Sequence, residues 1–300
     1  NAAASWFTHR KIYVNDLNQC TVDKPVPLEN ARITVTMFGL AGGSPMGLGD
    51  DMRTIDPERL RMLKLALPRT RDFPVPVDLF DRVYPDDYCR ILKLEVNTDW
   101  DSYLLAAVFN LDDHADCLEL DFRKLGLDGE KSYRVFEFWN EEYEGTFRKS
   151  CTVTVPPNAC RLFRIAGSRP HPWLLSTDMH VQQGAVEIAD VKWDAEKNKL
   201  TGTAMRPEGE IGNLFFLIPR QLKLINHETA NTLKDVRDMQ TVVRWPIAFR
   251  HDKEHFELRF ERMETDFVSR KGWLPYATEQ EWLAYLREHE DPESTRVVEG

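Results

Sequence analysis

Adjacent acidic residues are the first candidates for chemistry in this sequence. Four pairs occur, namely Asp50–Asp51, Asp86–Asp87, Asp112–Asp113 and Glu141–Glu142. Hydrolysis by two carboxyl groups requires the groups to face one another about 5 Å apart, one as nucleophile and one as acid and then base. Neighbouring residues of an extended chain point to opposite faces. We therefore do not interpret any adjacent pair as a catalytic pair.

Two short polar segments are better candidates, because each is expected at the end of a strand. They are Asn15-Asp16-Leu17-Asn18-Gln19 and Gly49-Asp50-Asp51. Loops at the carboxyl ends of parallel strands build the active sites of barrel enzymes. The same side chains can also cap the helices that follow, and the residues alone leave this structural interpretation open.

Three further groups could bind a metal ion or a sugar, but each has a plainer interpretation. His251 and His255 have the spacing of helical metal ligands, yet they lie between two β-patterned runs, which predicts a hairpin turn. The stretch Thr177–His180 could present polar groups to a sugar, although a packed linker fits it better. Tryptophan rings stack on sugars, but most tryptophans of a sandwich are core; the four considered are Trp100, Trp139, Trp193 and Trp245.

The elements that must position the polar segments alternate between strand and helix. We predict a short strand over 11–14, a helix over 28–40 with apolar residues on two faces, and a short segment at 45–49. Asp56-Pro57-Glu58 supplies an N-cap, an N1 proline and a first-turn acid for a helix that runs to Leu67. Strand and helix in alternation with short links are typical of parallel-sheet units.

From Asp72 the apolar residues alternate with a period of two, which predicts an antiparallel sandwich. In one strand, Leu118, Leu120 and Phe122 alternate with charged residues, as in a sheet with one face in water. The predicted strands span 90–96, 103–110, 117–122, 133–139, 143–148, 151–155 and 160–165.

A linker at 166–170 leads into a second β-rich region. Leu214–Ile218 has no polar alternation, so we predict a central strand that is covered on both faces. The tail then changes character, because Thr278–Glu281 is a capping box that predicts a C-terminal helix. The strands predicted here span 185–193, 199–204, 213–218, 241–249 and 255–262.

Composition excludes several classes of protein. The chain has 42% hydrophobic and 29% charged residues, as ordinary globular proteins do, and no apolar run approaches the ~20 residues that span a bilayer. A net charge of -10 argues against nucleic acid as a partner. The five cysteines form an odd set without CxxC, so we expect free thiols. The chain begins at Asn1 without a Met, so any targeting signal is expected upstream and no compartment is assigned.

Residues 14–68 resemble the last two βα units of the melibiase-type α-galactosidases, a clan of retaining glycosidases on (β/α)8 barrels. Asn15–Val22 resembles the clan's strand end that contains Asp-Pro-Asp, and 28–32 resembles the start of its penultimate helix. Gly49-Asp50-Asp51 followed by Pro57-Glu58-Arg59-Leu60 is the most specific motif.

The resemblance continues into the β-rich part. Residues 72–165 are similar to the C-terminal antiparallel domain of such enzymes, including Trp139–Tyr143 and the closing stretch Arg161–Ile165. Residues 170–300 match only loosely what some bacterial members append.

One departure concerns the sugar site that the resemblance implies. The clan has Asp-Pro-Asp where this chain has Asp16-Leu17-Asn18, so an amide replaces the second acidic group, which lines the sugar site in relatives. The implied substrate-binding residues are Asp16, Asn18, Gln19 and Asp50. The clan's nucleophile and acid/base lie on earlier barrel strands that these 300 residues lack. The resemblance therefore assigns no catalytic residue here, and it implies no cofactor and no metal.

The predicted fold is mixed, with the end of a catalytic (β/α)8 barrel at 1–70 and an antiparallel β-sandwich at 71–167. A second β-rich domain is predicted at 168–275, and a C-terminal helix and tail at 276–300. The implied function is that of a C-terminal part of a glycoside hydrolase that cleaves α-linked, galactoside-like sugars. Its expected partners are a glycoside or oligosaccharide substrate and the rest of the barrel, with neither nucleic acid nor membrane.

The alternative is a noncatalytic carbohydrate-binding β-sandwich protein. The two βα units at 1–67 argue against it, because a binding module has no need of them. Since the catalytic strands are expected elsewhere, we predict that residues 1–300 alone are inactive.

Overall fold

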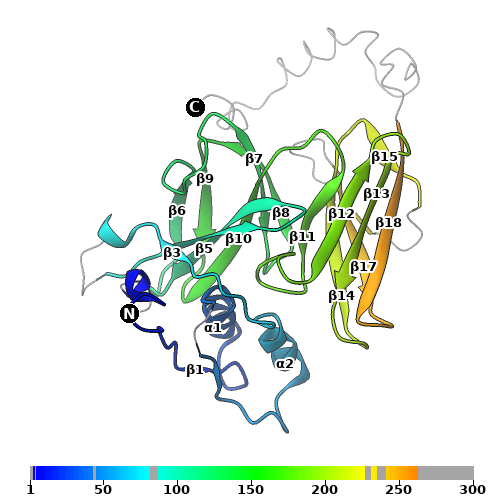
Figure 1. The fold of residues 1–300 in the computed structure, drawn as a ribbon. Helices are drawn as coiled ribbons and strands as arrows, with labels where there is room; N and C mark the ends of the chain where they lie inside the picture. The colour runs from blue at the N-terminus through cyan, green and yellow to red at the C-terminus, as the bar shows by residue number, and fades with distance from the viewer. Residues whose placement is uncertain are drawn as a thin grey trace. The chain divides into compact units, whose positions relative to one another are not determined.

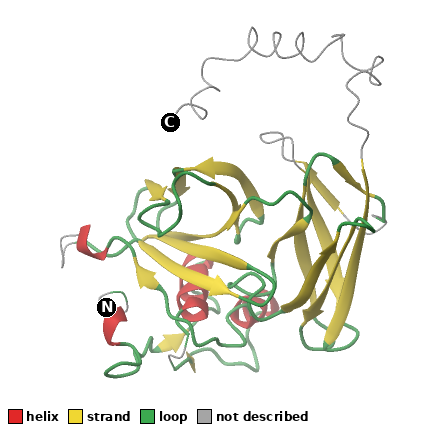
Figure 2. Ribbon diagram, turned by 45° about the horizontal axis from the view of Figure 1, so that its top comes forward, coloured by secondary structure: helices red, strands yellow, loops and turns green. Residues whose placement is uncertain are grey.

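The structure is a computed structural model that describes residues 3, 5–42, 45–81, 87–226, 231–234 and 241–262, with the backbone alone for 231–234. Asn1–Glu261 cluster as one compact unit, separate from Arg262–Gly300. The first unit consists mostly of β-sheets with few helices (Figures 1 and 2). The helix predicted from Thr278 lies outside the described residues.

Two helices and a short parallel strand pair form the N-terminal part. The elements are a 3-10 turn η1 (Trp6–Thr8), β1 (Gln19–Cys20), α1 (Leu28–Leu40), β2 (Gly47–Leu48) and α2 (Pro57–Lys64), with β1 and β2 parallel. The start of α2 is as predicted, because the Asp56 carboxylate accepts the N–H of Glu58 at 2.9 Å and Pro57 occupies the first turn. The helix predicted over 28–40 is confirmed as α1.

The strand predicted over 11–14 is wrong. The Thr8 carbonyl accepts the N–H groups of Lys11 and Ile12 at 3.1 and 3.0 Å, and Arg10 has a φ of 56°. These contacts close a turn, and the chain does not become a strand until Gln19. Residues 15–18 therefore precede the first parallel strand instead of following it.

A six-stranded antiparallel sheet forms the centre of the unit. In spatial order its strands are β3 (Val75–Pro76), β4 (Ile91–Asn97), β5 (Ser102–Asn110), β10 (Ala159–Gly167), β7 (Ser132–Glu137) and β8 (Glu142–Arg148). A two-stranded sheet of β6 (Asp116–Asp121) and β9 (Ser150–Val155) covers one face. Between the two sheets lies a core that includes Leu104, Leu120, Phe122 and Phe163. The 3-10 turn η2 (Leu79–Asp81) precedes β4.

The other face of the six-stranded sheet packs on the helices and on the following sandwich. One continuous core joins Val35 and Phe38 of α1, Leu105 of β5, Leu162 of β10 and Phe215 of the second sandwich. In Figure 1 α1 lies beside β10 and β5, with α2 next to it. Apolar burial thus connects all three parts of this unit.

The second sandwich consists of two four-stranded sheets. One is ordered β11 (Trp173–Thr177), β14 (Ile211–Ile218), β17 (Thr241–Ala248), β16 (Asn231–Lys234), and the other β12 (Ile188–Asp194), β13 (Lys199–Met205), β18 (Lys253–Arg262), β15 (Leu222–Leu224). Leu214–Ile218 is buried throughout and lies between β11 and β17, so the predicted central strand is confirmed.

Most strand predictions are confirmed. The seven strands predicted between 90 and 165 are β4 to β10, within two residues at each end, and the five predicted later are β12, β13, β14, β17 and β18, within three. Strands β11, β15 and β16 were not predicted. All five cysteines are free, as expected. Among the described residues, no helix is long and apolar enough to cross a membrane.

Candidate functional site

Asp16 and Asn18 shape the turn that leads into β1. The Asp16 carboxylate accepts the Asn18 N–H at 2.7 Å, and Asn18 has a φ of 68°. Asparagine tolerates this left-handed conformation better than most residues, and short polar side chains stabilise such turns. Both residues are exposed, so the turn presents a carboxylate and an amide beside the first residue of β1.

Gln19 faces the loop that follows β2. Parallel pairing aligns Gln19 with Gly47, and Gly49 donates its N–H to the Cys20 carbonyl at 3.0 Å. A Cβ on Gly49 would collide with the Thr21 hydroxyl and lie 3.4 Å from Gln19 Oε1. Glycine therefore permits the close approach of these two loops.

Asp50 orders the backbone that follows β1. Its carboxylate accepts the N–H of Val22 at 2.8 Å and that of Asp23 at 3.2 Å. Both carboxylate oxygens thus have a backbone donor. Asp50 joins the loop after β2 to the loop after β1, which brings it close to Gln19.

The structure tests one of the two interpretations of these segments, namely that their side chains cap the following helices. Neither segment supplies the N-cap of α1, where Pro27 stands without a side-chain cap bond, and Asp56 caps α2. Asp16 and Asp50 instead order a turn and a loop. The exposed groups of Asp16, Asn18 and Gln19 can still hydrogen-bond a hydroxylated ligand.

The adjacent carboxylates have separate structural partners. Asp51 forms a salt bridge with Arg53 at 2.6 Å, while Asp50 binds backbone. Glu141 forms a salt bridge with Arg244 at 2.9 Å, and Glu142 begins β8. The members of these two pairs therefore have different surroundings.

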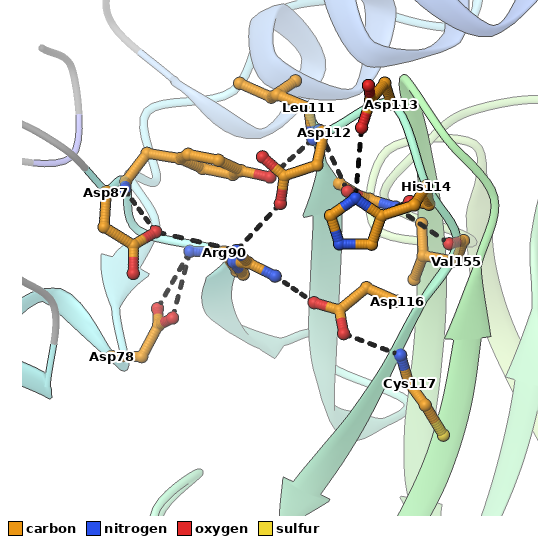
Figure 3. Close-up of polar contacts among 12 residues, drawn as sticks. Asp78, Asp87, Arg90, Leu111, Asp112, Asp113, His114, Asp116, Cys117 and Val155 are labelled. Carbon is orange, nitrogen blue, oxygen red and sulfur yellow. Dashed lines mark hydrogen bonds and ion pairs between the residues drawn. The ribbon is translucent and has the colours of Figure 1, made fainter.

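Arg90 gathers Asp87, Asp112 and Asp116 into an ion-pair cluster (Figure 3). Its guanidinium lies 2.9 Å from Asp112 and 3.7 Å from Asp87 and also pairs with Asp116. Buried Asp78 accepts the backbone N–H of Arg90 at 3.1 Å. The cluster ties the segment before β4 to the turn between β5 and β6, and Asp86 of the adjacent pair lies outside the described residues.

The two spaced histidines do not meet as metal ligands. His251 lies in the exposed turn between β17 and β18, as predicted, but these strands belong to different sheets, so the predicted hairpin is wrong. His255 Nδ1 lies 3.0 Å from the Thr203 hydroxyl. Within the described ranges, no group of three or more His, Cys, Asp or Glu residues is placed to hold a metal ion.

A buried polar segment follows β11, and the sequence pattern gives little indication of it. His180 and Gln182 are fully buried among the N-terminal elements. The Gln182 amide donates to the Gly39 carbonyl at 3.1 Å and to the Thr70 hydroxyl at 2.7 Å. The only signal was the irregular polar stretch Thr177–His180, and its interpretation as a packed linker agrees with this burial.

Burial also shifts the proton affinities of this segment. Burial, together with Arg206 and Arg69, lowers the pKa of His180 to about 3, so the ring is neutral. Its Nδ1 accepts the Gln182 N–H at 3.0 Å, which leaves Nε2 to donate to the Pro68 carbonyl at 3.1 Å. Burial raises the pKa of Glu187, which accepts the Gly184 N–H at 2.9 Å.

Comparison with known proteins finds a family match for one part of the chain. Residues 97–165 match the alpha galactosidase C-terminal beta sandwich domain. The resemblance predicted from the sequence is thus confirmed for this domain, which contains β5 to β9 and most of β10. No curated protein matches the chain.

The solved structures that match part of this chain include three glycosidases. They are alpha-galactosidase I from Mortierella vinacea (19% identity, TM-score 0.43, 56% of this chain and 44% of that one), an α-galactosidase from Saccharomyces cerevisiae (11%, 0.43, 56% and 50%), and a β-L-arabinopyranosidase from Geobacillus stearothermophilus (12%, 0.43, 56% and 41%). The aligned part of this chain spans half or less of each of these proteins.

Proposed function

We propose that this chain is the C-terminal part of a glycoside hydrolase that cleaves α-linked, galactoside-like sugars with retention of configuration. The observation that carries the proposal is the match of residues 97–165 to the C-terminal domain of α-galactosidases. On this proposal, residues 1–70 are the end of the catalytic barrel, and the two catalytic carboxylates lie on barrel strands outside the 300 residues.

The surface of the N-terminal part supports this assignment. Strands of parallel sheets are normally covered on both faces by helices. Here Leu48 of β2 is 47% exposed, and Ile12 and Tyr13 before β1 are 76% and 51% exposed. Further barrel elements would cover this apolar surface and complete the pairing of β1 and β2.

The exposed polar groups near β1 and β2 are the proposed sugar contacts. Asp16, Asn18 and Gln19 offer carboxylate and amide groups to sugar hydroxyls, and Asp50 holds the neighbouring loop in position. Because Asn18 carries an amide at a position that is acidic in the clan, it offers an N–H donor as well as an acceptor. The hydrogen-bonding groups that this position offers to a sugar therefore differ from those of an Asp-Pro-Asp enzyme.

Activity of the native protein tests the proposal. Native polypeptide captured with an antibody against residues 97–165 should hydrolyse 4-nitrophenyl α-galactoside, and the 300-residue chain assayed in parallel should not. Turnover by the 300-residue chain would place the catalytic groups inside it. Sugar binding by the native polypeptide without turnover would favour the noncatalytic carbohydrate-binding alternative.

A further inference from the structure

A groove of about 320 Å³ opens where the N-terminal helices meet both sandwiches. Leu28 of α1 and Met62 of α2 line one side, Trp139 of the β7–β8 turn lines another, and Asp178 comes from the segment after β11. This volume lies at the lower end of the roughly 300–1,000 Å³ typical of small-ligand pockets, which often lie between domains. The groove is built from residues other than Asp16, Asn18, Gln19 and Asp50.

The floor of the groove is apolar, and its aromatic ring is held in place. Leu28, Met62 and Leu65 line it together with the half-buried Trp139. The indole N–H of Trp139 donates to the Thr36 hydroxyl at 3.0 Å, which fixes the ring against α1. The ring is thus oriented before any ligand arrives, which lowers the entropy cost of binding.

The rim of the groove carries charges of both signs in pairs. Arg61 binds Asp178 at 3.0 Å, and Glu141 binds Arg244 at 2.9 Å. The guanidinium of Arg32 lies 5.6 Å from the centre of the Trp139 ring. Because these cations and carboxylates are paired, the rim offers both hydrogen-bond donors and acceptors without a strong field of either sign.

We propose that this groove binds a neutral saccharide, with one sugar ring against Trp139 and its hydroxyls hydrogen-bonded to the charged rim. A sugar has an apolar C–H face and a polar edge, which match the apolar floor and the mixed rim. Aromatic rings with fixed orientation are efficient anchors for such faces. The rim charges neutralise one another in pairs, so they give a charged ligand no net attraction. The inference concerns binding alone and does not depend on where catalysis takes place.

Calorimetric titration of the 300-residue chain with melibiose, a neutral disaccharide, tests the proposal. We expect saturable binding that weakens at least tenfold in Trp139→Ala. Leu28→Trp should weaken it similarly, because Leu28 is 47% exposed on the groove and a larger ring there fills the space without disturbing the core. This second variant keeps the test valid if Trp139→Ala folds poorly.

Matched controls separate the groove from the rest of the surface. Leu111→Trp and Trp193→Ala should bind melibiose as the unchanged chain does, since Leu111 is 50% exposed in the turn after β5 and Trp193 lies on β12, both outside the groove. Galacturonate and galactosamine, which carry charge, should bind more weakly than galactose.

Three results would overturn the inference. They are the absence of saturable melibiose binding, binding that survives both groove variants, and tighter binding of either charged sugar than of galactose. Binding lost in Asn18→Gly but retained in the groove variants would move the sugar to β1, which contradicts the inference and leaves the proposed function standing.

Discussion

At Asn18 the backbone conformation and the side-chain amide can be changed separately by mutation. The backbone adopts a φ of 68°, and the exposed amide faces outward beside β1. Replacement by alanine would strain the turn as well as remove the amide, because alanine resists this conformation. Replacement by glycine removes only the amide.

If the proposed function holds, Asn18→Gly in the longer polypeptide should weaken galactoside binding about 5- to 150-fold. Loss of the amide would leave a sugar hydroxyl without its hydrogen-bond partner, which costs roughly 1–3 kcal/mol of binding free energy and corresponds to this range. Inhibitor titration measures the affinity, and thermal melting should show almost no shift. Unchanged affinity with a lowered melting temperature would assign Asn18 to structure.

His180 should make the fold sensitive to mild acid. Its pKa in the folded protein is about 3, whereas an unfolded histidine titrates near 6.5. As the pH falls below about 6.5, the unfolded chain takes up a proton that the folded chain refuses, so the free energy of unfolding decreases. This group alone should remove about 2 kcal/mol between pH 6.5 and pH 5.

Urea unfolding at several pH values measures this dependence. His180→Gln should flatten the slope relative to the unchanged chain. The low pKa of His180 would be contradicted if the free energy of unfolding changed equally with pH in the unchanged chain and in His180→Gln. The sequence could not reveal this behaviour, because it gives the residue type but not its burial.

At the scale of elements, the alternation of apolar and polar residues predicted strands best where one face of the sheet is exposed to solvent. The alternation of Leu118 and Leu120 with charged residues located β6 to within a residue. Strand β11 has every residue buried and follows Pro172, so no alternation marked it. The strand predicted at 11–14 is instead a turn, because backbone hydrogen bonds to the Thr8 carbonyl close it. The local residue pattern does not reveal these bonds.

The same scale yields a prediction about stability. Strands β1 and β2 pair over two residues each, whereas α1 shares the central core with β5 and β10. In the 300-residue chain, amides of β1 and β2 should exchange with solvent much faster than those of α1 or β10, because short pairings open locally. Hydrogen exchange with mass spectrometry resolves the segments, and equal protection of β1 and β10 would contradict this view.

At the scale of the whole molecule, a buried ion pair holds the sandwiches and their linker together. Asp101 and Arg164 have no exposed side-chain surface, and Asp101 also pairs with Arg169. The Arg164 guanidinium donates to the Gln183 carbonyl, which belongs to the buried polar segment. The sequence could predict each sandwich separately, but it could not predict this junction, since the partners are more than 60 residues apart.

Removing Asp101 should therefore be costly. Asp101→Ala leaves Arg164 buried without its carboxylate, and we expect a loss of about 3–5 kcal/mol in the free energy of unfolding. Asp51→Ala removes an exposed pair with Arg53 and should cost far less, because solvent screens an exposed pair. Urea denaturation compares the two, and similar losses would show that the buried pair has no special role.

Covalent labelling of the native polypeptide tests most directly the claim that this chain completes a retaining glycosidase. A galacto-configured cyclophellitol epoxide forms an ester with the nucleophilic carboxylate of such an enzyme. Native polypeptide captured through residues 97–165 should carry one label, and peptide mapping should place it on a carboxylate outside the 300 residues. A label on an Asp or Glu within these residues, or no label on a polypeptide that binds galactosides, would contradict the account.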